Sequence, residues 1–568
     1  MISERATHLS DAMELPAGPL SWGPGDPEPD PARFSFTIDV IVRLATARAP
    51  GAPALWWRGD TISFANFDAA IDQCAAGLIE MFSKDAKASL DGQRIGVYVK
   101  KEPANIVLLF AVLRAGGIVV PLNPALKPEQ HAYIAGNCDM TAAFMPQNQI
   151  DLLKSAHRVD ALRWLGMAGA DLQSAIETVD AGAWRNQCIE CDRSPAEPAI
   201  LFYTSGSTGH PKGVMVTHHA NVLGAASVAH YLGISACDRV LTLLPLSFDY
   251  GFNQLVSTWA AGGCAVLHDF FLAADVPKVC ERAGVTGIAA VPPLWHMLLG
   301  AGWNQAAIAT LRFVTNSGGK LTPDIQGIMR AAFPQADIFA MYGLTEAFRS
   351  TYMPPDRLSE KPMSIGRAIP FARVAVAGPD GQVAVPGQAG ELVHAGPLVA
   401  AGYWNDPDRT AYRFRPVPEG LRSALGAKEG DMCVFSGDQV FRDEDGDFHF
   451  VGRLDEMIKV LGNRLSPQEI EDVVLLAPGV DAAAAFGLED AQVGAKILVV
   501  VQKGASAEDD AALDMAIRKT CRDHLPGYAQ ISHLLVLSAL PRNPNGKIDR
   551  PRLKADAMAL LANEASND

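Results

Sequence analysis

The chain has 568 residues, of which 49% are hydrophobic and 20% are charged. Its length exceeds the roughly 250–300 residues that one hydrophobic core can serve, so several structural units are expected. The composition is that of a folded globular protein and excludes a disordered or fibrous one. Acidic residues number 63 against 48 basic ones, a formal net charge of −15. This charge repels a phosphate backbone, which argues against nucleic acid as a partner.

The nine cysteines are scattered along the chain, which favours reduced thiols and a cytoplasmic location. Cys188 and Cys191 have the spacing of metal ligands, but no second pair lies near them to complete a zinc site. The first residues lack the basic end and apolar core of a signal peptide. The most apolar run, from Val107 to Leu122, is interrupted by Arg114 and falls short of the ~20 residues that a membrane span needs. It predicts a buried helix, a turn and a strand, and no integral membrane segment.

In chain order, residues 1–33 are predicted to form an irregular arm, because the stretch from Leu15 to Arg33 is rich in Pro, Gly and Asp. From Phe34 onward, helical-period stretches alternate with short β-rich runs such as RIGVYV, from Arg94 to Val99. This alternation predicts an α/β fold, with parallel sheets covered by helices, in a large N-terminal body.

The sequence pattern changes near residue 455, from a β-hairpin signal to an amphipathic helix. Before it, Asp445-Gly446 predicts a β-hairpin turn. After it, Ser466 is expected to cap an amphipathic helix, with Pro467 at the first helical position and Glu469 completing a capping box. A small α+β domain therefore follows the large body. The expected boundaries are 34–454 for the body, 455–556 for the small domain and 557–568 for a tail.

The strongest chemical signal is the run YTSGSTGHPKGVMVTH, which directly follows an apolar stretch. Its glycines let the backbone turn N–H groups inward, and its hydroxyls and lysine add donors, so it predicts a phosphate-binding loop. It is not a Walker loop, since Pro211 precedes the lysine and Gly213 follows it. A flexible linker is the alternative, but linkers do not follow a buried strand in this way. The candidate residues are Thr204, Ser205, Gly206, Ser207, Thr208, Gly209 and Lys212.

Two further motifs follow predicted strands. In MYGLTEAF, Glu346 beside Thr345 could hold Mg²⁺ on a nucleotide, and Tyr342 offers a flat face for a purine. In NSGGKLTP, a Gly-Gly turn lets the backbone approach a flat ligand closely.

The last third of the chain contributes three more candidates. Asp438 is placed where a strand ends, and a short carboxylate there can accept two ribose hydroxyls. Arg453 adds a fork of donors. Lys547 is predicted at the tip of a turn rich in Pro, Asn and Gly, where a lone lysine is usually only solvated.

In this order and spacing the motifs resemble the adenylate-forming superfamily, which includes acyl-CoA synthetases, aryl-CoA ligases, amino-acid adenylation domains and beetle luciferases. The resemblance covers the chain from about Phe34 to Arg552 and includes a further block, GELVHAGPLVAAGYWNDPDRT, from Gly390 to Thr410. It implies a large domain of layered sheets and helices, and a small C-terminal lid that is hinged near Asp455 and reorients between two half-reactions.

The resemblance also implies the chemistry. A carboxylate attacks the α-phosphorus of MgATP to give an acyl-adenylate and pyrophosphate; a thiol then takes the acyl group and AMP leaves. The first step joins two anions, so charge must be neutralised. By correspondence, Lys547 bridges the substrate carboxylate and the α-phosphate, Glu346 beside Thr345 holds Mg²⁺, and the loop from Thr204 to Lys212 covers the outer phosphates. The residues that would hold the adenosine are Gly318, Gly319, Lys320, Tyr342, Gly343, Asp438 and Arg453.

The acid itself is less defined. Gly343 stands where acetate-activating relatives carry a tryptophan that closes the acyl pocket, so the resemblance implies a larger acid, with a medium or long chain or an aromatic ring. Phe248 and Asp249 resemble the Phe-Asp pair with which amino-acid adenylation domains bind the substrate ammonium, and a carboxylate in a pocket favours a cationic partner. The alternative is that Asp249 is a helix N-cap. The serine that the family carries two residues later is Gly251 here.

No carrier-protein segment follows Lys547 in this sequence, so the thiol is expected to come from either CoA or a separate carrier protein, and CoA is preferred. The expected function is an AMP-forming acyl-CoA ligase with ATP and Mg²⁺ as cofactors. One alternative is a ligase that loads an acyl or amino acid onto the phosphopantetheine of a separate carrier protein. The others are a luciferase-like oxidase and a non-catalytic nucleotide-binding relative.

Overall fold

A computed structural model describes the chain except residues 1–19, 21, 23–25, 83–88, 157–162, 167–190, 192, 205–210, 455–457, 461–462, 491–493, 505–506, 508, 526, 545 and 566–568. Packing divides the chain into two compact units. The first comprises Met1–Val374, His394–Val417 and Leu425–Val434; the second comprises Ala375–Val393, Pro418–Ala424 and Phe435–Asp568. The predicted hinge, Asp455, lies outside the described residues, so the boundary near residue 455 stays a prediction.

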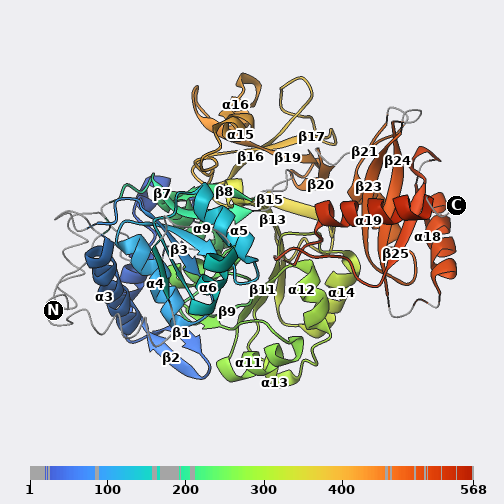
Figure 1. The fold of residues 1–568 in the computed structure, drawn as a ribbon. Helices are drawn as coiled ribbons and strands as arrows, with labels where there is room; N and C mark the ends of the chain where they lie inside the picture. Colours follow the sequence, from blue (N-terminus) through green and yellow to red (C-terminus); the bar gives the residue numbers. More distant parts are fainter. Residues whose placement is uncertain are drawn as a thin grey trace. The chain divides into compact units, whose positions relative to one another are not determined.

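A six-stranded sheet forms one layer of the first unit (Figure 1). Its strands are parallel except the last, which pairs antiparallel with its neighbour. The run from Val107 to Leu122 is a helix, a turn and a strand, as predicted. The strands lie in the order β6 (Arg163–Gly166), β5 (Ala142–Met145), β3 (Arg94–Tyr98), β4 (Ile118–Leu122), β7 (Pro198–Thr204) and β8 (Lys212–Thr217); the helices between them are α4 (Pro103–Arg114), α5 (Pro128–Asn137) and α6 (Gln147–Ala156).

The first unit also holds a second, longer run of paired strands. Its centre is parallel, as the alternating pattern predicts, and antiparallel strands flank it. Its strands, in spatial order, are β2 (Asp60–Ser63), β1 (Pro53–Trp57), β10 (Cys264–Leu267), β9 (Arg239–Thr242), β11 (Gly287–Ala290), β12 (Phe313–Asn316), β13 (Asp337–Gly343), β14 (Arg349–Met353) and β15 (Ser364–Ala368).

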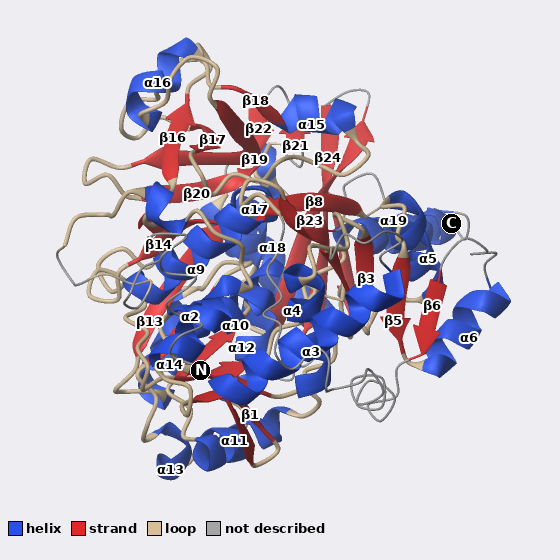
Figure 2. Ribbon diagram, turned by 90° about the vertical axis from the view of Figure 1, so that its left-hand side faces the viewer, coloured by secondary structure: helices blue, strands red, loops and turns tan. Residues whose placement is uncertain are grey.

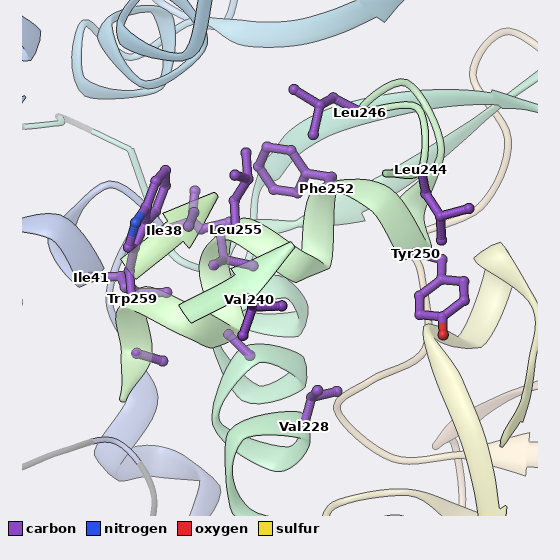
Figure 3. Packing of buried hydrophobic residues seen from close by; sticks show 14 of the residues in the cluster. Ile38, Ile41, Val228, Val240, Leu244, Leu246, Tyr250, Phe252, Leu255 and Trp259 are labelled. Atoms are coloured by element: carbon purple, nitrogen blue, oxygen red, sulfur yellow. The ribbon is translucent and has the colours of Figure 1, made fainter. Parts of the chain in front are cut away.

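Helices flank these strands (Figure 2). Two of them, α9 (His218–Tyr231) and α10 (Asp249–Ala260), are buried on nearly all sides, because their outward positions are also apolar or small. In Figure 3, Phe252 and Trp259 of α10 pack beside Val240 of β9, and Val228 of α9 lies below them. The remaining helices of four or more residues are α2 (Val40–Arg48), α3 (Phe64–Phe82), α11 (Val276–Ala283), α12 (Pro292–Leu299), α13 (Gln305–Ile308), α14 (Pro323–Ala332), α15 (Pro407–Arg413) and the 3₁₀ helix η1 (Pro31–Phe34).

The described residues of the N-terminal arm have no regular structure before η1, and most of them are exposed, but Leu20, Trp22 and Glu28 contact the body. Leu20 is 2% exposed. The ring of Trp22 stacks on His230 with centroids 3.9 Å apart, and Glu28 accepts a hydrogen bond from the backbone of Phe371 at 2.9 Å. The arm therefore covers apolar surface of the body, which the Pro- and Gly-rich composition did not suggest.

The second unit contains the predicted hairpin and the small α+β domain. Strands β19 (Met432–Arg442) and β20 (Phe448–Arg453) form the hairpin around Gly446. Ser466 caps α17 (Pro467–Val474) by accepting from the backbone of Gln468, not of Glu469. The other elements with residues in this unit are β16 (Arg373–Ala377), β17 (Gly390–Ala395), α16 (Glu419–Leu425), β21 (Ile458–Val460), β22 (Asn463–Leu465), β23 (Val480–Asp490), β24 (Gly494–Lys503), α18 (Asp510–His524), β25 (His533–Leu537) and α19 (Arg550–Ala565).

The three-stranded sheet β23-β24-β25 has helices on both faces. Alternate residues of β24 pack on opposite sides: Val499 lies in the cluster with α17 and α18, and Leu498 and Val500 lie in the cluster with α19. Burial of both faces explains why β24 reads as an unbroken apolar run. Among the described residues, no helix is both long and apolar enough to cross a bilayer.

Candidate functional site

Two of the predicted motifs of the first unit lie at the carboxyl ends of two neighbouring parallel strands. Residues 318–320 follow β12, and residues 342–343 end β13. Thr345 and Glu346 then form the short 3₁₀ helix η3 (Thr345–Ala347). In open α/β sheets the crevice beyond the carboxyl ends is where ligands bind, so the sheet alone brings these two motifs together.

The backbone at this edge is tightly constrained. Gly318 has φ +76°, a conformation that favours glycine, and Asn316 Nδ2 donates to the carbonyl of Gly319 at 3.0 Å. At Gly343 a Cβ would lie 2.8 Å from the Phe348 carbonyl oxygen and 2.8 Å from the Arg349 Cα. Glycine at 343 is therefore required by the close approach of β13 and β14, independently of the size of the acid.

Three side chains from distant segments meet beside this edge. Lys212 Nζ lies 2.6 Å from Glu346 Oε1 and donates to the hydroxyl of Tyr403 at 3.1 Å. The Tyr403 hydroxyl donates in turn to Glu346 Oε1 at 2.7 Å. The Lys212 ammonium also stands 4.6 Å from the centroid of the Tyr403 ring. This cluster, Lys212–Glu346–Tyr403, joins two predicted site residues to a tyrosine that was not among them.

Backbone pairing holds Tyr403 in this cluster. The segment around it lies against β8: Met215 N donates to Gly402 O at 2.9 Å, and Trp404 N donates to Gly213 O at 2.8 Å. Ala400 N donates to Glu346 O at 2.8 Å, which ties the same segment to η3. The conspicuous block GELVHAGPLVAAGYWNDPDRT thus supplies a site residue that sequence reasoning missed.

The electrostatics of the cluster keep Glu346 ionised. Burial by itself raises the pKa of this carboxyl, but the Lys212 ammonium and the Tyr403 hydroxyl outweigh burial and bring the pKa down to about 2. Burial lowers the pKa of His394 to about 3 against the attraction of Glu346, and its Nε2 has no hydrogen-bond partner among the described residues. The site therefore combines a fixed anion, an ammonium and a neutral imidazole.

The predicted phosphate loop is closed by a hairpin. Thr204 at the end of β7 pairs with Lys212 at the start of β8. The Thr204 hydroxyl is buried and has no hydrogen-bond partner among the described residues. The loop residues Ser205, Gly206, Ser207, Thr208 and Gly209 lie outside the described residues.

Phe248 and Asp249 start α10. Phe248 is the N-cap residue and Asp249 occupies the first helical turn, so the N-cap interpretation of Asp249 is wrong by one position. A carboxylate in the first turn still interacts favourably with the helix dipole. The next residue, Tyr250, bonds Thr315 of β12 through the two hydroxyl oxygens, 2.5 Å apart, which brings the start of α10 to the same edge of the sheet.

In the second unit, Asp438 and Arg453 are direct partners. They face each other across β19 and β20, and Arg453 Nη1 lies 2.8 Å from Asp438 Oδ1. Asp438 is 3% exposed and its backbone N–H donates to Ser436 Oγ at 3.0 Å. The hairpin thus places together the two side chains that the sequence assigned to a ribose.

Lys547 lies on a turn that is held by its own backbone. Asn543 Oδ1 accepts from Lys547 N at 3.1 Å, and Asn543 N donates to Lys547 O at 2.7 Å. Gly546 has φ +79°, and Arg542 pairs with Ile548 across the turn. These bonds define the backbone position from which the lysine side chain starts.

Family comparisons agree with this arrangement. The family described as "AMP-binding enzyme" matches residues 42–404, and the family described as "AMP-binding enzyme C-terminal domain" matches residues 469–547. These ranges contain the Lys212–Glu346–Tyr403 cluster and the Lys547 turn, respectively.

Two proteins of similar sequence and one of similar structure extend this comparison. Sulfoacetate–CoA ligase of Cupriavidus necator is 32% identical over 475 residues, covering 81% of this chain and 87% of the relative. Bacitracin synthase 3 of Bacillus licheniformis is 28% identical over 91% of this chain, which spans 8% of that protein. The ATP-bound structure of MatB from Rhodopseudomonas palustris has a TM-score of 0.80 at 23% identity and covers 92% of this chain and 99% of that one, which shows the shared fold.

Proposed function

The chain belongs to the AMP-binding enzymes, and from this premise we propose that it is an AMP-forming acid–thiol ligase. In the first step an oxygen of the substrate carboxylate bonds to the α-phosphorus of ATP, the bond from that phosphorus to the bridging oxygen breaks, and pyrophosphate leaves. In the second step a thiol sulfur bonds to the acyl carbon, the acyl–oxygen bond breaks, AMP leaves, and the thiol proton passes to solvent.

The observation that carries this proposal is the Lys212–Glu346–Tyr403 cluster at the carboxyl end of β13. Joining a carboxylate to a triphosphate requires cations at the phosphates. Lys212 supplies one, at the foot of the predicted phosphate loop. Glu346 is ionised and offers carboxylate oxygen, the ligand type that Mg²⁺ prefers, so the residues present fit that metal. When bound, Mg²⁺ would neutralise charge on the outer phosphates of ATP.

The ion pair of Lys212 with Glu346 then has a specific consequence. An ammonium 2.6 Å from the carboxylate occupies the place that a second cation would take. We therefore infer that the pair opens when the nucleotide binds, with Lys212 turning to the phosphates while Tyr403 continues to orient Glu346. The Thr204 hydroxyl, which lacks a described partner, is a donor ready for the same phosphates.

The adenosine and the reacting carboxylate are assigned to the remaining predicted residues. Residues 318–320 and 342–343 would frame the adenine, and Asp438 with Arg453 would hold the ribose. Lys547, on its braced turn, would neutralise the carboxylate and the α-phosphate as they meet. Asp455 would be the hinge of the lid that carries it.

Similar proteins support a choice of acceptor thiol and of substrate class. We propose CoA as the acceptor, since sulfoacetate–CoA ligase, by its name, uses it. Loading of a separate carrier protein remains the second candidate, because the chain also matches a segment of a bacitracin synthase. In that case Asp249 would bind a substrate amine, and Asp249→Ala would impair amino acids while leaving simple acids unaffected.

Pyrophosphate release tests the proposal. The purified chain is incubated with ATP and Mg²⁺ and with single acids: sulfoacetate, aromatic acids, fatty acids of increasing length and amino acids, each with and without CoA. The proposal expects acid-dependent pyrophosphate, and an acyl-CoA when CoA is present. Nucleotide binding without acid-dependent pyrophosphate for any acid would instead indicate a non-catalytic relative. Light emission that depends on oxygen would indicate a luciferase-like oxidase.

A further inference from the structure

Arg349 is a buried cation at the edge of the sheet where the site residues gather. It is 4% exposed and opens β14, directly opposite Gly343, the last residue of β13. Because β14 runs antiparallel to β13, its first residue lies at the carboxyl end of β13. Arg349 follows Glu346 by three positions. None of the predicted roles uses it.

The neighbours of this guanidinium are aromatic rings, a phenol hydroxyl and a sulfur. Its Cζ stands 4.4 Å from the centroid of the Tyr250 ring and 5.6 Å from that of Phe348. It interacts electrostatically with the Tyr231 phenol, and its Nη1 lies 3.8 Å from Met341 Sδ, a weak acceptor. Among the described residues, no carboxylate lies within ion-pair distance of Arg349.

Arg114 shows how the same chain satisfies a buried guanidinium when the role is structural. Arg114 is 0% exposed and contacts three aspartates, Asp39, Asp68 and Asp72, at 2.7–3.4 Å. Removing a charge from water is costly unless an anion and hydrogen bonds compensate. The aromatic contacts of Arg349 compensate in part, but the described residues offer its five N–H donors no oxyanion.

The backbone before Arg349 is held in a rare conformation. Phe348 has φ +60° and ψ −115°, which a bulky residue seldom adopts, and its ring fills the space above Gly224 of α9. Such strain persists where the surroundings over-determine it, commonly at functional sites. The next two side chains, Ser350 and Thr351, are buried and their hydroxyls have no hydrogen-bond partner among the described residues. Two buried hydroxyls without described partners therefore follow Arg349 in the sequence, and Arg349 itself has no described carboxylate partner.

The contacts of Arg349 place it on the acyl side of the site. Tyr250, which its guanidinium covers, directly follows Phe248 and Asp249, the residues expected to line the acyl pocket. On its other flank lies Gly343, where a Cβ would lie 3.1 Å from the Arg349 Cγ, so Arg349 directly adjoins this predicted site residue. Lys212, assigned to the phosphates, contacts Glu346 and Tyr403 instead.

Resting on the proposed function, we propose that Arg349 is a specificity-determining residue that binds a second anionic group at the far end of the acid. The substrate is then a dianion: one carboxylate is activated by ATP, and a carboxylate or sulfonate at the other end pairs with Arg349. The planar fork of the guanidinium accepts such an oxyanion through two parallel hydrogen bonds. Arg349 would select an anionic group on the acid, whereas Asp249 in the carrier-protein alternative would select a cationic amine. The same panel of acids therefore distinguishes the two proposals.

The test compares acids that differ only at the far end. Each acid with a terminal carboxylate, and a parallel set with a terminal sulfonate, is paired with the methyl-terminated acid of the same length, and kcat/KM for pyrophosphate release is measured. The inference expects wild type to prefer an anionic member by on the order of a hundredfold, the cost of leaving a buried charge partner unpaired. Which anionic set gives the preference distinguishes carboxylate from sulfonate.

Substitutions of Arg349 then test whether this residue causes the preference for anionic acids. Arg349→Met should lower kcat/KM for the anionic acid by on the order of a hundredfold and change the methyl-terminated acid only a few-fold; Arg349→Lys should retain part of the preference. The control is Arg312→Met, because Arg312 also contacts a ring but forms a half-exposed ion pair with Asp238 at the amino end of β12, opposite the carboxyl end where the site residues lie. It should leave the ratio between paired acids unchanged.

The outcomes separate this inference from the proposed function. Pyrophosphate release with methyl-terminated acids only, or with amino acids only, overturns the inference and leaves the proposed function standing. No release with any acid overturns both. If Arg349→Met does not fold, two measurements on wild type test the inference. The first is the ratio of kcat/KM between the anionic acid and its methyl-terminated partner. The second is the unfolding temperature without ATP, which the dianion should raise and its methyl-terminated partner should not.

Discussion

The Lys212 ammonium and the Glu346 carboxylate form a part-buried ion pair 2.6 Å long between the start of β8 and the 3₁₀ helix after β13. The two residues are 134 positions apart in the sequence, and Tyr403 bonds both of them. The pair thus ties the predicted phosphate loop to the predicted metal ligand, and the first predictions concern its members.

Glu346→Gln should remove most adenylate formation. The amide keeps the shape of the side chain but loses the charge that would hold Mg²⁺, and loss of one preorganised electrostatic partner lowers kcat by on the order of a hundredfold to a thousandfold. The measurement is acid-dependent pyrophosphate release across a Mg²⁺ titration. Glu360→Gln, at an exposed glutamate in the same unit, is the control. An unchanged Mg²⁺ dependence in Glu346→Gln would remove Glu346 from the metal site.

Tyr403→Phe should lower kcat/KM by about tenfold, because it removes one hydrogen bond from each of two buried charged groups. It should also raise the pKa of Glu346, since the hydroxyl helps to stabilise the carboxylate. The acid limb of the pH–rate profile then moves to higher pH. Tyr412→Phe, at a 70% exposed tyrosine nearby in sequence, should leave both quantities as in wild type.

Lys547→Ala should abolish adenylate formation and leave the transfer of a preformed acyl-adenylate to the thiol largely intact. The reason is that only the first step brings two anions together. Both half-reactions are measured separately, with Lys496→Ala, at a half-exposed ion pair of the same unit, as the control. Equal loss of both half-reactions would show that Lys547 is not the residue that joins carboxylate and α-phosphate.

Two buried histidines, His218 and His394, should make the protein sensitive to acid. Burial lowers the pKa of His218 to about 4 and that of His394 to about 3, whereas an unfolded histidine titrates near pH 6.5. Below about pH 6.5 the unfolded chain binds protons that the folded chain does not, so each histidine lowers the free energy of unfolding by about 1.4 kcal/mol per pH unit.

Chemical denaturation at a series of pH values measures this slope. His394→Gln should flatten it, and His524→Gln, at an exposed position, should not. A wild-type free energy of unfolding that stays constant between about pH 6.5 and about pH 4 would contradict the burial of neutral histidines.

Local patterns predicted local structure well. Asp445-Gly446 forms the hairpin turn, Ser466 caps a helix, and the apolar run from Val107 to Leu122 is a helix, a turn and a strand. Each depends on neighbours within a few residues, whose geometry the residue types largely determine. The pairing of Asp438 with Arg453 follows from that same hairpin register.

What the sequence left undetermined depends on long-range pairing. Tyr403 reaches Glu346 because its segment lies against β8, nearly two hundred residues earlier, and no local pattern encodes that pairing. Arg349 was not among the predicted site residues, because its burial and its ring contacts depend on residues that are distant in the sequence. Glycine at position 343 was interpreted as opening the acyl pocket to a larger acid, whereas the structure shows that backbone contact with β14 requires glycine there.

The most direct test of the central claim follows an oxygen atom. The preferred acid is prepared with a heavy oxygen isotope in both oxygens of the reacting carboxylate, then incubated with ATP, Mg²⁺ and CoA, and the nucleotide product is analysed by mass spectrometry. An acyl-adenylate leaves one carboxylate oxygen on phosphorus, so the account predicts AMP that carries a single labelled oxygen. Unlabelled AMP, or label in orthophosphate beside ADP, would contradict it.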